Sequence, residues 1–155
     1  CYMEIKKNNE NTKLFLFSPK GKTLNNNMSY EYAKLDNITL LCGHYEGIDQ
    51  RIVDMIVDEE ISIGDYVLTG GELASLVFLD SVSRKITGVL SSSENVQDES
   101  FENNLLEYPQ YTRPYVFMGV KVPDVLISGN HKKIDEWRKN KSLEETKKKR
   151  PDLIK

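Results

Sequence analysis

This chain of 155 residues lacks any apolar run of the roughly 18 residues that a membrane-spanning helix needs. It also has no charged-then-apolar signal segment at its start. Its only two cysteines, Cys1 and Cys42, cannot make a disulfide framework, and Cys42 ends an apolar run typical of a reduced core residue. We therefore expect a chain without membrane association in a reducing cytoplasm.

An excess of positive charge is also missing, because the net charge is −3. This excludes a uniformly basic nucleic-acid binder. The charge is uneven, however: residues 131–155 carry ten Lys and Arg against five Asp and Glu, whereas residues 1–130 carry 11 against 19. A basic end on an acidic body favours a polyanion on one side, although a solvated helix face with a lysine-rich end would explain the charge equally well.

Common nucleotide-binding signatures are absent. The segment 60–73 holds a Gly70-Gly71 turn but neither G-x-G-x-x-G spacing nor a G-K-[ST] ending. The segment 18–23 does end in Gly-Lys-Thr, but Leu16 stands where a P-loop has its first glycine. The two histidines, His44 and His131, show no metal-ligand spacing, so no metal site is expected.

What the first part of the chain does contain is an alternation of apolar strands and amphipathic helices. Strands are expected at 13–17, stopped by the polar turn 18–21, and at 38–42 and 66–68; helices are expected at 29–35, after a cap at Asp49, and at 72–84. This order predicts an α/β fold with a largely parallel sheet. Because ligands bind at the carboxyl ends of such strands, the three glycine-bearing loops there should line one site.

The composition changes at Ser91. Residues 91–105 are expected to form a flexible linker between a domain at 1–90 and a small, mostly helical domain at 106–155. In that last part, residues 122–127 are expected to be extended, and a helix is expected after the turn at 128–131.

Several polar residues allow two interpretations. Arg84 ends the helix at 72–84, where it complements the helix dipole or, alternatively, clamps an anionic oxygen. Asp98 and Glu99 are either solvated linker acids or functional groups. Tyr45 and Glu46 lie between Gly43 and Gly47 and have no obvious structural reason to be there.

Four ordered motifs together resemble one family. They are residues 42–49 (CGHYEGID), 63–73 (IGDYVLTGGEL), 111–114 (YTRP), and 128–131 (SGNH) followed by Trp137-Arg138. The resemblance is to bacterial tRNA (guanine-N1)-methyltransferases of the SPOUT class, and it runs from about residue 13 to 154. It implies a trefoil-knotted α/β domain that methylates the guanosine directly 3′ of the anticodon.

The resemblance also implies a cofactor, S-adenosylmethionine, held bent in the knot loops. The residues that it assigns to cofactor binding are Ser18, Pro19, Gly43, Tyr45, Glu46, Ile63, Gly64, Tyr66, Leu68, Gly70 and Gly71. It further implies tRNA as substrate and a homodimer whose active site is shared between the subunits. The need for a divalent cation such as Mg²⁺ stays open.

For catalysis, the resemblance implies Arg84 as the cation near guanine O6 and an aspartate at the linker end as the base. Here the motif reads Asp98-Glu99-Ser100-Phe101, and spacing from Arg84 places Glu99 on the base position. A slip of one residue would present Asp98 instead. We favour Glu99 and keep Asp98 as the alternative.

The family also has an N-terminal segment and a longer C-terminal region that are not seen here, and the chain opens on Cys1. We therefore expect that both ends are incomplete. Two other functions stay open: a catalytically silent RNA-binding or ligand-binding fragment, and a related knotted methyltransferase that acts on ribose 2′-OH.

Overall fold

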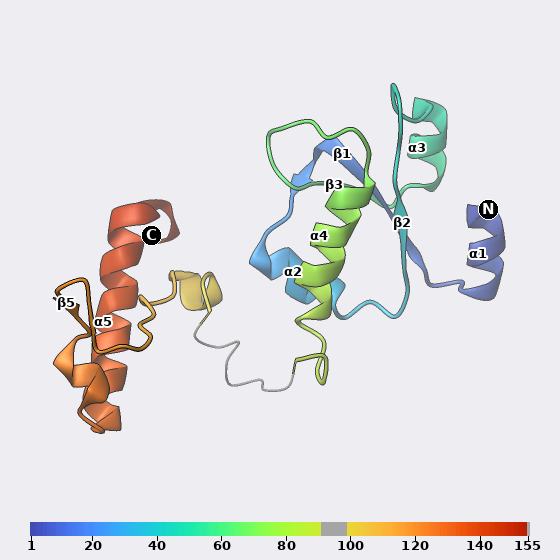
Figure 1. Ribbon diagram of the computed structural model, residues 1–155. Helices are drawn as coiled ribbons and strands as arrows, with labels where there is room; N and C mark the ends of the chain where they lie inside the picture. Colours follow the sequence, from blue (N-terminus) through green and yellow to red (C-terminus); the bar gives the residue numbers. More distant parts are fainter. Residues whose placement is uncertain (91–98, 155) are drawn as a thin grey trace. The chain divides into compact units, whose positions relative to one another are not determined.

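The computed structural model describes residues 1–90 and 99–154 (Figure 1). The chain divides into two compact units, Cys1–Ser91 and Ser92–Lys155, and each is described by itself. Asp98 lies outside the described residues. No helix within the described ranges is long and apolar enough to cross a lipid bilayer.

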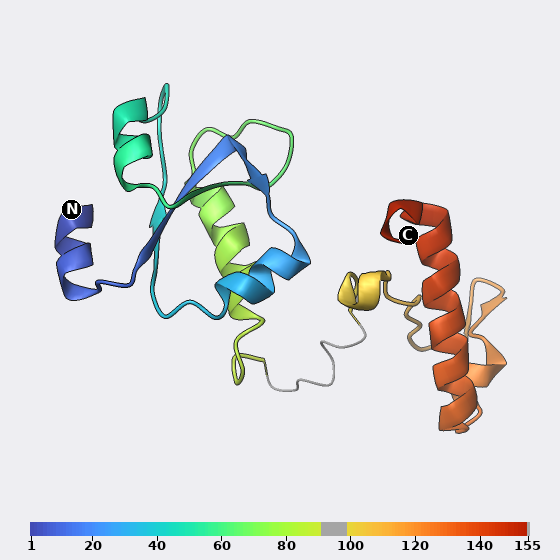
Figure 2. The ribbon, with the colours of Figure 1, turned by 180° about the vertical axis from the view of Figure 1, so that it is seen from behind.

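The first unit is built around a three-stranded parallel sheet in the order β2-β1-β3. Its strands are β1 (Lys13–Thr23), β2 (Ile38–Leu41) and β3 (Glu59–Ser62), and its helices are α1 (Tyr2–Asn8), α2 (Asn26–Tyr32), α3 (Gln50–Ile56) and α4 (Glu72–Ser83). Figures 1 and 2 show α4 and α3 beside different parts of this sheet. The predicted α/β class with a parallel sheet is confirmed.

Strand β1 does not stop at Ser18, as the sequence predicted, but continues to Thr23 after an irregularity. Its register against β3 shifts between Phe17 and Lys22, and Ile61 is the partner of both. The residues left out of this ladder, 18–21, are called the β1 bulge below. Pro19 has no N–H to give to a ladder, which favours the interruption. The sequence therefore located the polar segment correctly, but the prediction that the strand ends there was wrong.

The third strand was predicted in the wrong place. Residues 66–68 form a loop in which Tyr66 and Val67 are exposed, and β3 lies earlier, at Glu59–Ser62. Ile61 is fully buried in β3, and Gly64, with φ of +145°, turns the chain out of the sheet before Tyr66. Strand propensity alone favoured the wrong apolar triplet because pairing with β1 decides the position.

Helix caps explain where α2 and α3 begin. Asn25 caps α2 by accepting a hydrogen bond from the Met28 N–H, so this helix starts earlier than the predicted Ser29, which is buried. Asp49 caps α3 by accepting from the Arg51 N–H at 2.9 Å, as predicted.

The core of the unit lies between the sheet and α4. Phe78 of α4 packs against Phe15 and Phe17 of β1, each with ring centroids 5.7 Å apart, and against Tyr32 at 5.5 Å. The helix has nearly its predicted bounds, but its buried face carries Ala74, Phe78 and Val82. Its larger apolar residues Leu73, Leu76, Val77 and Leu79 are exposed.

The second unit centres on α5 (His131–Lys149), whose N-cap is Asn130. The unit also contains 3₁₀ turns η1 (Glu102–Asn104), η2 (Asp124–Ile127) and η3 (Pro151–Leu153), and the hairpin β4 (Val116–Phe117) and β5 (Val120–Lys121). Buried Thr146 of α5 accepts a hydrogen bond from the Leu106 N–H at 2.8 Å and so ties the preceding segment to the helix. The helix was predicted correctly, whereas most of the extended piece at 122–127 is the turn η2.

Replacing Phe78 with Ala is expected to lower the free energy of unfolding by about 3–5 kcal/mol, because it removes the ring shared by three aromatic neighbours. The neighbouring Leu79→Ala is the control, since Leu79 is 55% exposed and its loss should change stability by about 0.5 kcal/mol. Urea unfolding followed by circular dichroism measures both. Equal effects of the two substitutions would contradict this account of the core.

Stability should also depend on Asp58, which accepts hydrogen bonds from the Leu14 N–H at 2.8 Å and from Lys13 Nζ at 3.0 Å. Partial burial raises the pKa of Asp58, but these two bonds outweigh burial and hold its pKa below the ordinary value of 3.8. A depressed pKa stabilises the fold above the unfolded value, and this contribution is lost as the pH falls through the folded value. In urea titrations at several pH values, the advantage over Asp58→Asn should therefore be full at pH 6 and shrink below about pH 4; a gap that widens on acidification would contradict this.

Candidate functional site

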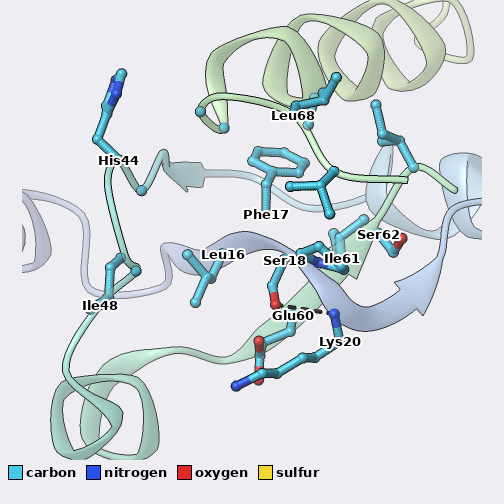
Figure 3. A pocket seen from close by; sticks show the side chains of 18 of the residues that line it. Leu16, Phe17, Ser18, Lys20, His44, Ile48, Glu60, Ile61, Ser62 and Leu68 are labelled. Atoms are coloured by element: carbon cyan, nitrogen blue, oxygen red, sulfur yellow. Dashed lines mark hydrogen bonds between the residues drawn. The ribbon is translucent and has the colours of Figure 1, made fainter. Parts of the chain in front are cut away.

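A cavity of about 350 Å³ lies at the carboxyl ends of the three strands (Figure 3). Its walls come from the end of β1 with the β1 bulge, from the loop after β2, and from β3 with the loop that leads to α4. This arrangement follows from the parallel sheet, because all three strands end at the same edge. The structure thus brings the three predicted loops to one site.

Every residue that the sequence assigned to the cofactor lines this cavity: Ser18, Pro19, Gly43, Tyr45, Glu46, Ile63, Gly64, Tyr66, Leu68, Gly70 and Gly71. They come from three segments that are far apart in the chain. Their binding of a cofactor stays a prediction, but their common location is a property of the fold.

The loop after β2 is joined directly to the start of α4. The Gly71 N–H donates to the Gly43 carbonyl at 3.2 Å, and His44 Nε2 contacts the carboxylate of Glu72. A hydrogen bond from its own backbone N–H, followed by the His44 contact, lowers the pKa of Glu72. Tyr45 has a φ of +58° and an entirely exposed ring, so this backbone presents the ring to the solvent rather than to the core.

The glycines of the loop before α4 are needed for close packing. A Cβ on Gly71 would lie 2.8 Å from the Cα of Cys42. Real Cβ atoms essentially never come within 3.0 Å of another heavy atom in this way. Gly70 is similarly close to the side chains of Glu72 and His44. Gly71 therefore lets this loop lie directly against the end of β2, whereas a Cβ on Gly70 would meet only side chains.

The wall formed by residues 63–71 suits a flat heteroaromatic ring. Ile63 and Leu68 are partly buried hydrophobic residues that pack against the core and also line the cavity. Within the described residues, the N–H groups of Leu68, Thr69 and Gly70 have no hydrogen-bond partner in the chain. An apolar wall beside available backbone donors can hold the face and the polar edge of a purine at once.

The sequence analysis missed several lining residues. Lys20 of the β1 bulge, Glu60 of β3, and Gln50 and Val53 of α3 all line the cavity, as does His44. No local pattern marks them, because their meeting depends on the strand order and on the register shift in β1. Glu60 was also missed because the third strand was predicted at 66–68, whereas Glu60 belongs to the actual strand β3.

The predicted catalytic residues belong to different units. Arg84 is the C-cap residue of α4 in the first unit. Glu99 belongs to the second unit, where it lines another cavity, of about 630 Å³, together with Tyr108 and Arg138. Their roles stay predictions, and Asp98 lies outside the described residues. In residues 1–90 and 99–154, no group of three or more His, Cys, Asp or Glu is placed to hold a metal ion.

Comparison with known proteins gives a consistent picture. The family model described as tRNA (Guanine-1)-methyltransferase TrmD matches residues 2–155. The chain is 58% identical over 148 residues to the tRNA (guanine-N(1)-)-methyltransferase of Clostridioides difficile (strain 630), which covers 96% of the chain and 64% of that protein. It is 55% identical over 161 residues to the protein of the same name from Alkaliphilus oremlandii (strain OhILAs), covering 100% of the chain and 65% of the relative. The chain therefore spans slightly less than two thirds of these relatives.

Adding a methyl group at Gly71 should disturb the site more than adding one at Gly43. The Cβ of Gly71→Ala would overlap the Cys42 backbone and should cost about 1–3 kcal/mol of unfolding free energy. Gly43→Ala, the matched control, would meet only the Ile48 side chain at an ordinary 3.6 Å and should cost under about 1 kcal/mol. Urea unfolding compares the two, and a larger loss for Gly43→Ala would refute the packing argument.

Proposed function

This chain belongs to the tRNA (guanine-1)-methyltransferase family, whose model matches residues 2–155, and from that membership we propose that it transfers a methyl group from S-adenosylmethionine to N1 of the guanosine directly 3′ of the anticodon in tRNA. The observation that carries the proposal is the cavity at the strand ends, which gathers all the residues assigned to the cofactor. Family membership supports the reaction, and the cavity supports the place where the cofactor binds.

We propose that the loop 63–71 holds the adenine and ribose through backbone groups and the apolar side chains of Ile63 and Leu68. Ser18 and Pro19 of the β1 bulge lie on one side of this wall, and Gly43, Tyr45 and Glu46 form another part of the lining. When bound, the cofactor supplies an electrophilic methyl group on a sulfonium. Positioning of the acceptor nitrogen in line with that methyl would account for much of the rate.

The acceptor nitrogen sets the remaining requirements. Guanine N1 carries a proton, so a base must remove it while negative charge develops on O6. In this proposal the Glu99 carboxylate takes the proton, with Asp98 as the alternative base. The guanidinium of Arg84 stabilises the developing charge on O6. The helix-ending position of Arg84 also leaves its structural role in place, because a cation there complements the α4 dipole.

The finer features of the family belong to this proposal as well. They are a trefoil knot in the first domain at 1–90, a linker at 91–105, a helical tRNA-binding domain at 106–155, and a cytoplasmic location. The net charge of +5 over residues 131–155 supports contact with the tRNA backbone. We propose a homodimer with an active site shared between the subunits, and the exposed apolar residues Leu73, Leu76 and Leu79 of α4 support it, since such a surface is normally covered.

A second candidate is a catalytically silent fragment that binds RNA or the cofactor. One observation favours it: Glu99 stands where the resemblance implies an aspartate as the base. A third, a methyltransferase acting on ribose 2′-OH, differs from the first in the atom that is modified. Mass spectrometry of the digested product nucleosides separates base from ribose methylation.

The test is methyl transfer from labelled S-adenosylmethionine to a tRNA carrying that guanosine, with and without Mg²⁺. Glu99→Ala is expected to lower the rate by about 10²–10⁴-fold, as for loss of a general base. Arg84→Ala is expected to lower it by about 10²–10³-fold, as for loss of charge stabilisation on O6. The adjacent Lys85→Ala is the matched control for charge and should change the rate less than about threefold.

The outcomes discriminate between the candidates. A large loss in Asp98→Ala with little loss in Glu99→Ala would transfer the role of base to Asp98. A wild-type chain that binds cofactor and tRNA without turnover would establish the silent fragment, and one that binds neither would end the proposal.

A further inference from the structure

The cavity contains two charged side chains that the proposed function does not use, Lys20 and Glu60. Their positions are fixed by the β1 bulge. The Lys20 N–H donates to Ser18 Oγ at 3.2 Å, which closes a tight turn at the start of the bulge. One residue later, Gly21 lies so close to β3 that an added Cβ would be 2.5 Å from the Glu60 carbonyl oxygen. The backbones that carry the two charges are therefore packed directly against each other.

The side chains extend into the same part of the cavity. Figure 3 shows the Lys20 side chain reaching across the end of β1 toward Glu60. In the part of the chain that the structure describes, neither residue forms a salt bridge. The next lysine on the strand behaves differently, because Lys22 pairs with Glu59 at 2.9 Å and does not line the cavity. One Lys–Glu pair on these two strands is thus structural, and the other presents two opposite charges to the site.

Two opposite charges that share one wall complement a zwitterion. The proposed cofactor has such a group, since its methionyl end carries a carboxylate and an ammonium separated by one carbon. Besides its tyrosines, the other ionisable residues in the described lining are His44, which contacts Glu72, and Glu46, which lies on the loop after β2. Among the described residues that line the cavity, Lys20 is therefore the one lysine or arginine that can meet a carboxylate.

We infer that Lys20 binds the carboxylate, and Glu60 the ammonium, of the amino-acid end of the cofactor; this inference rests on the proposed function. The purine is held by the loop 63–71, so the two ends of one ligand would be recognised by different walls. The affinity for a ligand that keeps the purine and sulfur but lacks the amino-acid end should then not depend on Lys20 or Glu60.

Isothermal titration calorimetry on the 155-residue chain tests this with two ligands. S-adenosylhomocysteine carries the amino-acid end, and 5′-methylthioadenosine lacks it. Lys20→Met is expected to weaken the affinity for S-adenosylhomocysteine by about five- to tenfold, the range of a charge-assisted contact at a partly exposed site. It should leave the affinity for methylthioadenosine within about twofold of the wild-type value. Glu60→Gln should show the same selective loss.

The matched control is Lys22→Met, the same substitution two residues along the same strand. It should leave the affinity for both ligands within about twofold, because Lys22 pairs with Glu59 outside the cavity. Thermal melting of each variant checks that the fold is kept.

Each result decides something. If Lys20→Met weakens both ligands equally, or neither, the inference is wrong while the proposed cofactor site stands. If the wild-type chain binds neither ligand, the proposed cofactor use fails and the inference falls with it. If Lys22→Met reproduces the selective loss, the effect is one of general surface charge and the assignment to Lys20 is overturned.

Discussion

The contact of Phe78 with Phe15 and Phe17 joins α4 to the middle of β1, and the position of the site follows from it. Because α4 is held at Phe78, its first turn lies over the end of β2, where Gly71 packs against Cys42 and donates to the Gly43 carbonyl. Burial of this large aromatic ring contributes both apolar area and specific ring geometry to the joint.

The site combines rigid and adaptable parts. Its apolar wall continues into the core through Ile63 and Leu68, which ties the cavity to the most stable part of the unit. The loop after β2 is held at one end by the Gly43 carbonyl and beside it by the contact of His44 with Glu72, whereas Tyr45 at its tip is fully exposed. An apolar wall continuous with the core beside a loop with an exposed aromatic ring is an arrangement that can admit a ligand and then partly cover it.

The sequence predicted the class of fold and the loops of the site, and the reason is local. Short apolar runs bounded by glycine identified β1 and β2, and the cap at Asp49 identified α3. Errors arose where distant pairing decides the outcome. The strand at Glu59–Ser62 exists because it pairs with β1, which propensity at 66–68 could not reveal, and the buried face of α4 is chosen by the aromatic residues of β1. Lys20 and Glu60 were missed for the same reason. The residues of the family motifs were found because their order in the chain carries information that no single segment has.

The β1 bulge places a constraint on length as well as on composition. Since Ile61 is the partner of both Phe17 and Lys22, β1 is in effect two short strands joined by a spacer of fixed length. Side chains alternate between the faces of a sheet, so a spacer shorter or longer by one residue would turn Lys22 and Thr23 to the opposite face. Over evolutionary time this segment should therefore resist insertions and deletions, and its length should vary less than that of the loops that border the same cavity.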